Sequence, residues 1–198
     1  MSNNYKVGVF GSAGGEEEIL AATEKARVVG RKLAENHCIV VTGACMGLPY
    51  EAAAEAHKNG GEIWGYSPCL DLDGQKLYTP DDDITIYNKI FYVTPDFLFA
   101  KDILVTKKYR NVLTTSTSDA GIMIAGRWGT LNEFTNLMDM GKVIGVLTGT
   151  GGAADEIPKL MKLIIKKESL GQVIFSDDPE MLVTLVIKEL DERRKVQQ

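Results

Sequence analysis

Cysteine and histidine are scarce in this chain of 198 residues, and their placement argues against two classes of site. The three cysteines, Cys38, Cys45 and Cys69, are odd in number and form no Cys-x-x-Cys pair, so a disulfide framework or a structural zinc site is not expected. The two histidines, His37 and His57, have no partner visible in the sequence and are expected to be structural. Cys45 lies in a glycine-rich loop and could face a ligand, whereas the other cysteines flank apolar runs and are expected in the core.

Long apolar runs and an excess of positive charge are also missing. No apolar run approaches the roughly 20 residues of a membrane-spanning helix. Residues 1–6 lead directly into an apolar run and leave no room for a signal peptide. The net charge of −5 gives the chain as a whole no footprint typical of nucleic-acid or anionic-membrane binding. We therefore expect a cytoplasmic protein with neither a nucleic-acid polymer nor a membrane as its partner.

Short apolar runs alternate along the chain with stretches of helical periodicity. The apolar runs, mostly rich in β-branched residues, span residues 7–10, 38–42, 63–67, 121–125, 143–147 and 173–175. The helical stretches span residues 16–36, 49–59, 97–117, 131–141, 154–167 and 179–194. This alternation predicts a doubly wound α/β fold, with a mostly parallel sheet and helices on both faces. Because no linker or repeat interrupts it, we predict one domain over residues 1–198.

Residues 70–88 interrupt this alternation. The segment combines five aspartates with Gly74 and Pro80, a composition typical of a surface loop, and an apolar run follows at residues 90–93. The spacing of the aspartates lacks the glycine and the closing glutamate of a calcium-binding loop. We predict a solvated loop at the rim of a pocket and no metal site.

Four glycine-rich loops follow predicted strands, at residues 11–15, 42–47, 126–130 and 148–152. In a parallel sheet the carboxyl ends of the strands share one edge, where ligands gather. The first loop contains Gly11 and Ser12, but the acids at residues 16–18 would repel a phosphate, so this loop is expected to meet a base or a ribose or only to turn the chain. The second contains Gly43 and Gly47 and is a cleaner anion site. One such loop is weak evidence because tight turns need glycine anyway, but four predict a small phosphorylated or nucleotide-like ligand.

The third loop carries the most specific pattern. An apolar run ends in Gly126-x-x-Gly129-Thr130, and a helical stretch with Glu133 near its start follows. Because the free N–H groups of a helix start attract anions, this pattern predicts a phosphate cradle with a candidate catalytic carboxylate beside it. On the preceding helix, Lys107 and Lys108 are expected to form a solvated basic face.

Together these motifs resemble the LOG-type superfamily. The likeness covers roughly residues 6–175 and rests on Arg110-Asn111, Ser118-Asp119-Ala120 and the pattern from Gly126 to Glu133, together with residues 42–47, 51–53 and 60–68 upstream. Members of this superfamily are often labelled lysine decarboxylase-like. They include cytokinin-activating phosphoribohydrolases and molybdenum-cofactor carrier proteins.

The resemblance implies a Rossmann-like fold, a homodimer and a nucleoside 5′-monophosphate or similar, AMP-like ligand. In the hydrolase branch an arginine and the motif glutamate cleave the N-glycosidic bond between the base and ribose 5-phosphate. Those roles would fall on Arg110 and Glu133, with Gly126, Gly129 and Thr130 holding the phosphate. The carboxylate would stabilise the positive charge that builds on the ribose, or it would activate water. No lysine lies in a recognisable pyridoxal-phosphate motif, so no cofactor is expected.

Two positions depart from the hydrolase branch. Arg127 stands where that branch has a glycine, and it would either contact the phosphate or fill the space that the glycine leaves open. Asn111 stands where that branch has a lysine, and with residues 149–155 it is closer to the uncharacterised and cofactor-carrier branches. The leading hypothesis is therefore a nucleoside 5′-monophosphate hydrolase. The rival is a non-catalytic nucleotide or molybdenum-cofactor carrier, and a third reading makes the loops plain turns of a structural subunit.

Overall fold

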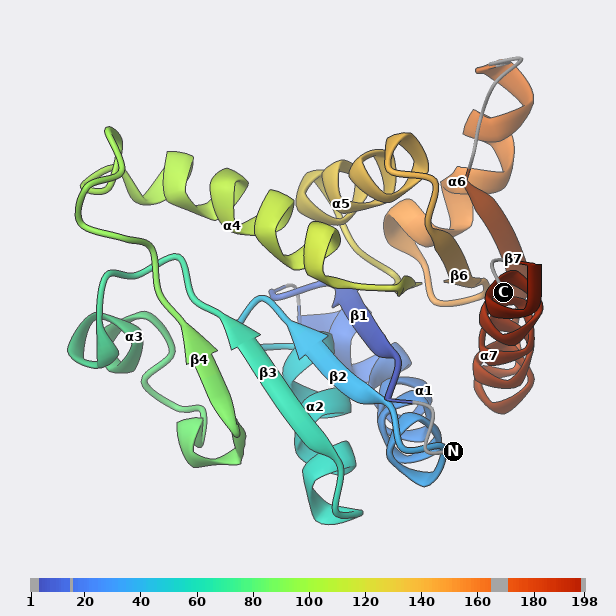
Figure 1. Ribbon diagram of the computed structural model, residues 1–198, viewed down its shortest axis with the longest axis horizontal. Helices are drawn as coiled ribbons and strands as arrows, with labels where there is room; N and C mark the ends of the chain where they lie inside the picture. Colours follow the sequence, from blue (N-terminus) through green and yellow to red (C-terminus); the bar gives the residue numbers. More distant parts are fainter. Residues whose placement is uncertain (1–3, 15, 165–170, 197–198) are drawn as a thin grey trace.

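The computed structural model describes residues 4–14, 16–164 and 171–196, without the side chains of residues 16–19. Its centre is a seven-stranded sheet in which every pairing is parallel, in the order β4-β3-β2-β1-β5-β6-β7 (Figure 1). The strands are β1 (Lys6–Gly11), β2 (Ile39–Thr42), β3 (Glu62–Tyr66), β4 (Lys89–Phe91), β5 (Ala120–Ile124), β6 (Val143–Leu147) and β7 (Gln172–Ser176).

Helices cover both faces of this sheet (Figure 1). One face carries α1 (Glu16–Glu35), α2 (Leu48–Lys58) and α7 (Pro179–Val196), and the other carries α4 (Ile103–Thr117), α5 (Trp128–Asp139) and α6 (Gly152–Leu163). The prediction of a doubly wound, Rossmann-like α/β fold is confirmed. None of the described helices is long and apolar enough to cross a membrane.

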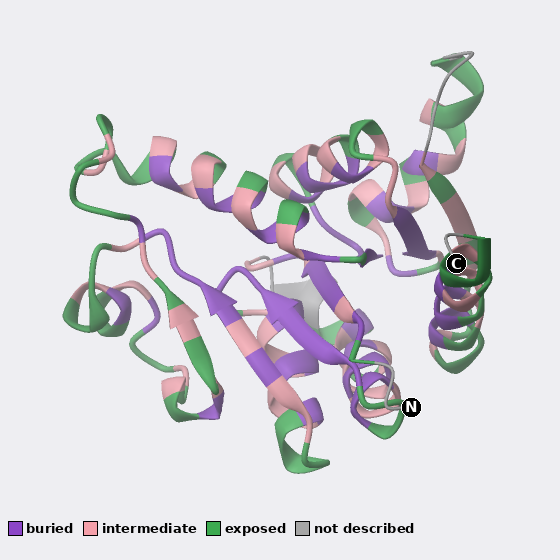
Figure 2. Cartoon of the chain, viewed as in Figure 1, coloured by how far each residue is buried: buried purple, intermediate pink, exposed green. Residues whose placement is uncertain are grey.

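Burial on both faces explains why the strands read as continuous apolar runs. β2, β5 and β6 are buried along their whole length (Figure 2). The larger cluster of buried apolar side chains lies between the sheet and α1, α2 and α7, and a second lies between the sheet and α5 and α6. A strand with no solvated face has no position at which a polar residue is favoured, so the alternating pattern of a half-exposed strand is lost.

Residues 70–88 are not the plain loop that their composition predicted. They contain α3 (Leu72–Tyr78) and a short 3₁₀ helix, η1 (Ile84–Ile86). The aspartates start these elements: Asp71 Oδ1 accepts a hydrogen bond from the Gly74 N–H at 2.8 Å, and Asp83 Oδ1 accepts one from the Thr85 N–H at 2.9 Å. Part of the acid cluster that suggested a solvated loop therefore acts in helix capping.

Two further helices start three or more residues away from their predicted bounds. α4 begins at Ile103 rather than at residue 97, because Asp102 Oδ1 caps it by accepting hydrogen bonds from the N–H groups of Leu104 and Val105. α5 begins at Trp128, three residues earlier than its apolar periodicity indicated. Residues 165–167, placed in a helix by the sequence pattern, lie outside the described residues.

The order of the strands reverses beside β1. From β1 the chain adds β2, β3 and β4 on one side of the sheet, and it then returns to place β5, β6 and β7 on the other. The carboxyl ends of β1 and β5, at Gly11 and Ile124, are paired neighbours. In open parallel sheets a ligand crevice forms at this kind of switch point.

Candidate functional site

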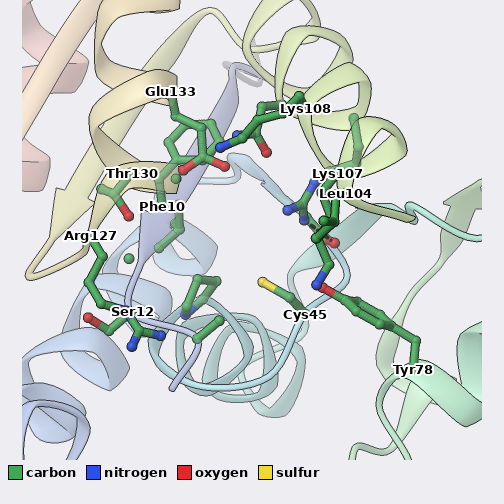
Figure 3. A pocket seen from close by; sticks show the side chains of 18 residues that line it. Phe10, Ser12, Cys45, Tyr78, Leu104, Lys107, Lys108, Arg127, Thr130 and Glu133 are labelled. Atoms are coloured by element: carbon green, nitrogen blue, oxygen red, sulfur yellow. Dashed lines mark hydrogen bonds between the residues drawn. The ribbon is translucent and has the colours of Figure 1, made fainter. Parts of the chain in front are cut away.

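A cavity of about 340 Å³ opens beyond the carboxyl end of β1 (Figure 3). Its walls come from β1 and the loop after it, the loop after β2, and residues of α2, α3, α4 and the start of α5. This volume is within the usual range for small-molecule sites. Eight predicted site residues line it: Gly11, Ser12, Gly43, Arg110, Arg127, Gly129, Thr130 and Glu133.

The two remaining predicted glycines, Gly47 and Gly126, shape the backbone instead of lining the cavity. Both have positive φ angles, 81° and 95°. A Cβ on Gly126 would lie 2.5 Å from Thr130, and one on Gly47 would overlap the carbonyl oxygen of Ser12. Ser12 Oγ also accepts a hydrogen bond from the Gly126 N–H at 3.0 Å, which ties the first and third loops together.

The fourth glycine loop, residues 148–152, does not line the cavity, so the expectation of four ligand loops is corrected to three. Its polar groups are engaged within the protein. Asp155 accepts hydrogen bonds from the N–H groups of Gly149 and Gly151, and Thr150 Oγ1 accepts one from the Ala125 N–H at 2.8 Å. The loop therefore supports the turn that follows β5. The acids at residues 16–18, which follow the first loop, have side chains outside the described residues.

The buried guanidinium of Arg110 explains why the second loop needs a glycine. Arg110 is 8% exposed, and its Nη1 donates to the carbonyl oxygen of Gly43. A Cβ at Gly43 would overlap this guanidinium. Burial opposes the charge of Arg110, but the nearby Cys45 and Glu133 favour it, and the net effect raises its pKa further. Arg110 therefore presents a fixed positive charge to the cavity.

The carboxyl group of Glu133 changes between its protonated and ionised forms near neutral pH. It is 7% exposed, and burial raises its pKa to about 7, although the positive charges of Arg110 and Lys108 act in the opposite direction. Near neutral pH both forms of this carboxyl group are populated, so it can donate or accept a proton. Such a pKa suits a group that takes part in acid–base chemistry.

The first turn of α5 is open to an anion. Arg127 occupies the N-cap position and its side chain makes no capping hydrogen bond, which leaves the first N–H groups of the helix without a side-chain acceptor. A Cβ on Gly129 would meet nothing within 4 Å, so there is free space at this turn. The Arg127 side chain extends toward the loop after β1 and lies beside Ser12 (Figure 3).

One residue that lines the cavity was missed from the sequence, and others were expected in a different environment. Lys107 and Lys108 were expected on a solvated face; Lys108 is indeed exposed and Lys107 is half-buried, and both also line the cavity. A signal was present, because Lys107 lies three residues before Arg110 and therefore on the same side of the helix. Tyr78 was missed because it belongs to α3, where a plain loop was predicted. Cys45 lines the cavity, as its loop suggested it could.

Asn111 is also part of the wall. It is 2% exposed, and its Nδ2 donates to Asn132 Oδ1 on α5 at 3.0 Å. The residue that departs from the hydrolase pattern thus joins the two helices that frame the cavity. Within the described residues, no group of three or more His, Cys, Asp or Glu side chains is arranged to hold a metal ion.

Solved structures with the same fold include proteins with different described roles. TM1055 is 19% identical with a TM-score of 0.76, covering 93% of this chain and 99% of its own. The molybdenum cofactor binding protein from Rippkaea orientalis is 18% identical with a TM-score of 0.68, covering 96% and 99%. DNA processing protein A from Helicobacter pylori, described for its single-stranded DNA binding mode, is 18% identical with a TM-score of 0.64, covering 94% and 81%. At this identity the likeness shows a shared fold.

The last of these structures corrects the expectation that no nucleic-acid polymer can be a partner. A protein with this fold binds single-stranded DNA, so that exclusion was wrong. The reason is that a net charge of −5 is an average over the whole chain. Four cations, Lys107, Lys108, Arg110 and Arg127, gather around one cavity, and an average does not report this local charge.

No curated protein matches the chain. A family model does match, over residues 4–183, and it is the model of the SLOG cluster4 family. This match covers most of the sequence and confirms the resemblance to the LOG-type superfamily. The chain, with its Rossmann-like fold of the nucleotide-binding type, belongs to the SLOG cluster4 family.

Proposed function

We propose that the cavity binds a nucleoside 5′-monophosphate and hydrolyses its N-glycosidic bond to release the free base and ribose 5-phosphate. The observation that carries this proposal is the buried carboxyl group of Glu133, with a pKa raised to about 7, next to the first turn of a helix that is open to an anion. A phosphate at the start of α5, near Gly129, Thr130 and Arg127, brings the ribose toward Glu133.

The chemistry follows from this placement. As the bond between the anomeric carbon and the base nitrogen breaks, its electron pair goes to the base, which takes up a proton from water, and positive charge builds on the ribose. The Glu133 carboxylate stabilises that charge, or it accepts a proton from the water whose oxygen bonds to the anomeric carbon. The charge of Arg110 lowers the pKa of Glu133 and keeps a share of it ionised at neutral pH. Its guanidinium also offers hydrogen-bond donors at the same wall.

The test is release of free base and ribose 5-phosphate from a panel of nucleoside 5′-monophosphates. Glu133→Gln should lower the rate by roughly 10²–10⁴-fold, because the carboxylate is lost while the shape of the side chain is kept. The wild-type rate should rise up to about pH 7 and then level off, as the Glu133 carboxylate forms. Glu180→Gln, which changes an exposed carboxylate on α7, is the matched control and should leave the rate unchanged. No release by the wild type, or equal release by Glu133→Gln, would overturn the proposal.

A second candidate is a carrier that binds a nucleotide or molybdenum cofactor without turnover. Two observations favour it: the shared fold with the Rippkaea orientalis molybdenum cofactor binding protein, and Arg127 in the cavity wall where hydrolases of the LOG type have a glycine. A carrier should be stabilised by its ligand, with the melting temperature rising as ligand is added, while the ligand stays intact. Mass spectrometry of ligand retained through native purification separates the two functions. The homodimer and the cytoplasmic location stay predictions.

A further inference from the structure

The cavity holds more positive charge than a monophosphate needs. Four cations line it, Lys107, Lys108, Arg110 and Arg127, against the single carboxyl group of Glu133. In the described part of the chain, none of the four has a carboxylate within ion-pair distance, although several surface cations, such as Arg27, Arg31 and Lys32, do pair with one. A phosphate monoester brings at most about two negative charges at neutral pH. Even with Glu133 ionised, one positive charge is left over.

The surplus charge can be located. Arg127 lies at the start of α5, where the phosphate is proposed to bind. Arg110 and Lys108 act on Glu133, since the charge of each lowers the pKa of its carboxyl group. Lys107 is the cation that remains, and its Nζ lies 5.0 Å from the centroid of the Tyr78 ring.

Lys107 and Tyr78 form a second polar corner of the cavity. They come from α4 and α3 and lie across the cavity from Arg127 and Ser12 (Figure 3). Burial raises the pKa of Tyr78 to about 12, so its hydroxyl stays protonated and can donate a hydrogen bond. A cation beside a hydroxyl donor is a combination that suits an anionic oxygen.

We infer that the ligand carries a second anionic group, remote from its 5′-phosphate, and that Lys107 and Tyr78 bind this group. The inference rests on the proposed function, because it takes the first phosphate to lie at α5. A carboxylate on the base or a second phosphate on the ribose would each supply the required oxygens.

Two matched pairs of nucleotides separate these sources. Orotidine 5′-monophosphate differs from uridine 5′-monophosphate by a carboxylate on the base, and adenosine 3′,5′-bisphosphate differs from adenosine 5′-monophosphate by a phosphate on the ribose. Isothermal titration calorimetry at low salt should show roughly tenfold tighter binding of the doubly anionic member in at least one pair, the gain typical of a charge-assisted hydrogen bond.

Variants test whether Lys107 and Tyr78 produce this preference for the doubly anionic nucleotide. Lys107→Met keeps the aliphatic stem and removes the charge, so the preference should fall to less than about threefold, and Tyr78→Phe should lower it by a smaller factor. Lys101→Met removes the same charge at an exposed lysine that does not line this cavity, and it should keep the wild-type preference.

Failure of the second anionic site and failure of the proposed function would give different results. Equal affinity within both pairs would overturn the second anionic site and leave monophosphate binding intact. Adenosine diphosphate carries its extra phosphate next to the 5′-phosphate. If it gains as much affinity over the monophosphate as the bisphosphate does, in the wild type and in Lys107→Met alike, the extra charge binds at α5 and the inference is wrong. If none of these nucleotides binds, the proposed function fails as well.

Discussion

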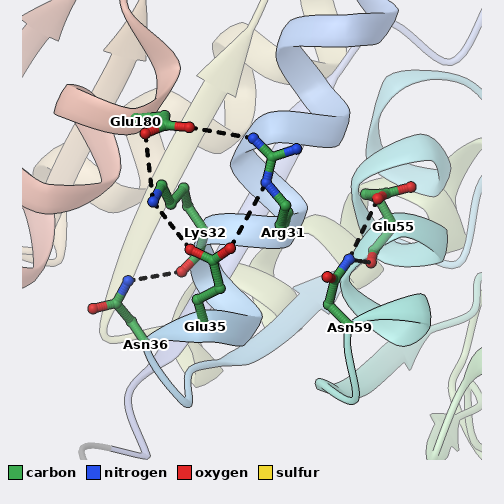
Figure 4. A network of polar contacts seen from close by, with 7 residues as sticks. All are labelled: Arg31, Lys32, Glu35, Asn36, Glu55, Asn59 and Glu180. Atoms are coloured by element: carbon green, nitrogen blue, oxygen red, sulfur yellow. Dashed lines mark hydrogen bonds and ion pairs between the residues drawn. The ribbon is translucent and has the colours of Figure 1, made fainter.

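Two charged regions of this protein are built on opposite plans. On the surface between α1 and α7, Arg31 and Lys32 each contact both Glu35 and Glu180, at distances between 3.0 and 3.8 Å (Figure 4). At the carboxyl edge of the sheet, the cations around the cavity have no carboxylate within ion-pair distance among the described residues. The charges of the first region pair with one another, whereas the cations of the second are available to a ligand.

Burial makes the difference matter. The side chains of Arg31 and Glu180 are 37% and 51% exposed, so water stabilises their charges whether or not they pair. Arg110 and Glu133 are only 8% and 7% exposed. A buried, poorly paired charge costs stability, and such groups tend to occur at binding and catalytic sites. The paired surface network therefore contributes little to the fold, whereas the buried charges of the cavity cost stability that a bound ligand can offset.

The largest expected effect on stability is that of Glu133→Gln in the cavity. Its folded-state pKa of about 7 lies above the ordinary glutamate value of 4.5, so the folded state binds this proton more tightly than the unfolded state. The resulting stability is fully present below about pH 4.5 and is lost as the pH rises through 7. Glutamine avoids that loss, so the free energy of unfolding of the variant relative to the wild type should grow by on the order of 3 kcal/mol between these limits.

Urea denaturation at about pH 5 and about pH 8 measures this change, because the window brackets most of the titration. Glu180→Gln is the control, since it removes a carboxylate from the exposed network. If Glu133→Gln and the wild type differed in free energy of unfolding by the same amount at both pH values, the cavity would not raise the pKa of Glu133. The two charged regions would then not differ in the way described.

A second effect concerns the backbone under the cavity. Gly126 and Gly60 both have positive φ angles, 95° and 75°, but a Cβ on Gly126 would meet Thr130 whereas one on Gly60 would meet nothing within 4 Å. Gly60→Ala should therefore cost only the conformational strain of about 1–2 kcal/mol. Gly126→Ala should cost about 1 kcal/mol more, because overpacking adds to the strain. It should also displace Thr130 and weaken ligand binding.

Thermal denaturation of the two variants side by side measures this difference. Ligand binding by each variant, measured by calorimetry, then shows whether the turn acts on the cavity. If Gly126→Ala were no more damaging than Gly60→Ala and bound ligand normally, the close approach of Gly126 to Thr130 would have no functional meaning.

Local patterns predicted most of the fold. β2, β5 and β6 were identifiable because burial on both faces favours nearly continuous apolar runs. α3 was missed because it is short and starts at Asp71, a residue that serves a loop equally well. The single domain over residues 1–198 stays a prediction.

The site was harder to predict where its parts meet across the chain. Arg110, Thr130 and Glu133 were found because a motif carries them, and they do line one cavity. The role of the fourth glycine loop could not be predicted from its own residues, because it depends on a hydrogen bond from the Ala125 N–H to Thr150 Oγ1, which are far apart in the sequence. The spacing of Lys107 and Arg110 places both on one side of α4, but that this side faces the cavity depends on how α4 packs against the sheet.

The smallest effect is expected at the surface network, and it has the opposite sign to the first. Glu180→Gln removes the contacts to Arg31 and Lys32 and one acid from the first turn of α7. Exposed pairs of this kind contribute little, so the free energy of unfolding should fall by no more than about 1 kcal/mol. About 0.5 M salt should shrink the loss, because screening weakens exposed pairs, while the gain from Glu133→Gln at high pH should persist since that group is shielded from ions. A salt-independent loss of more than about 2 kcal/mol at Glu180 would mean that the network holds α7 against α1, and the two regions would then differ in exposure but not in their importance for the fold.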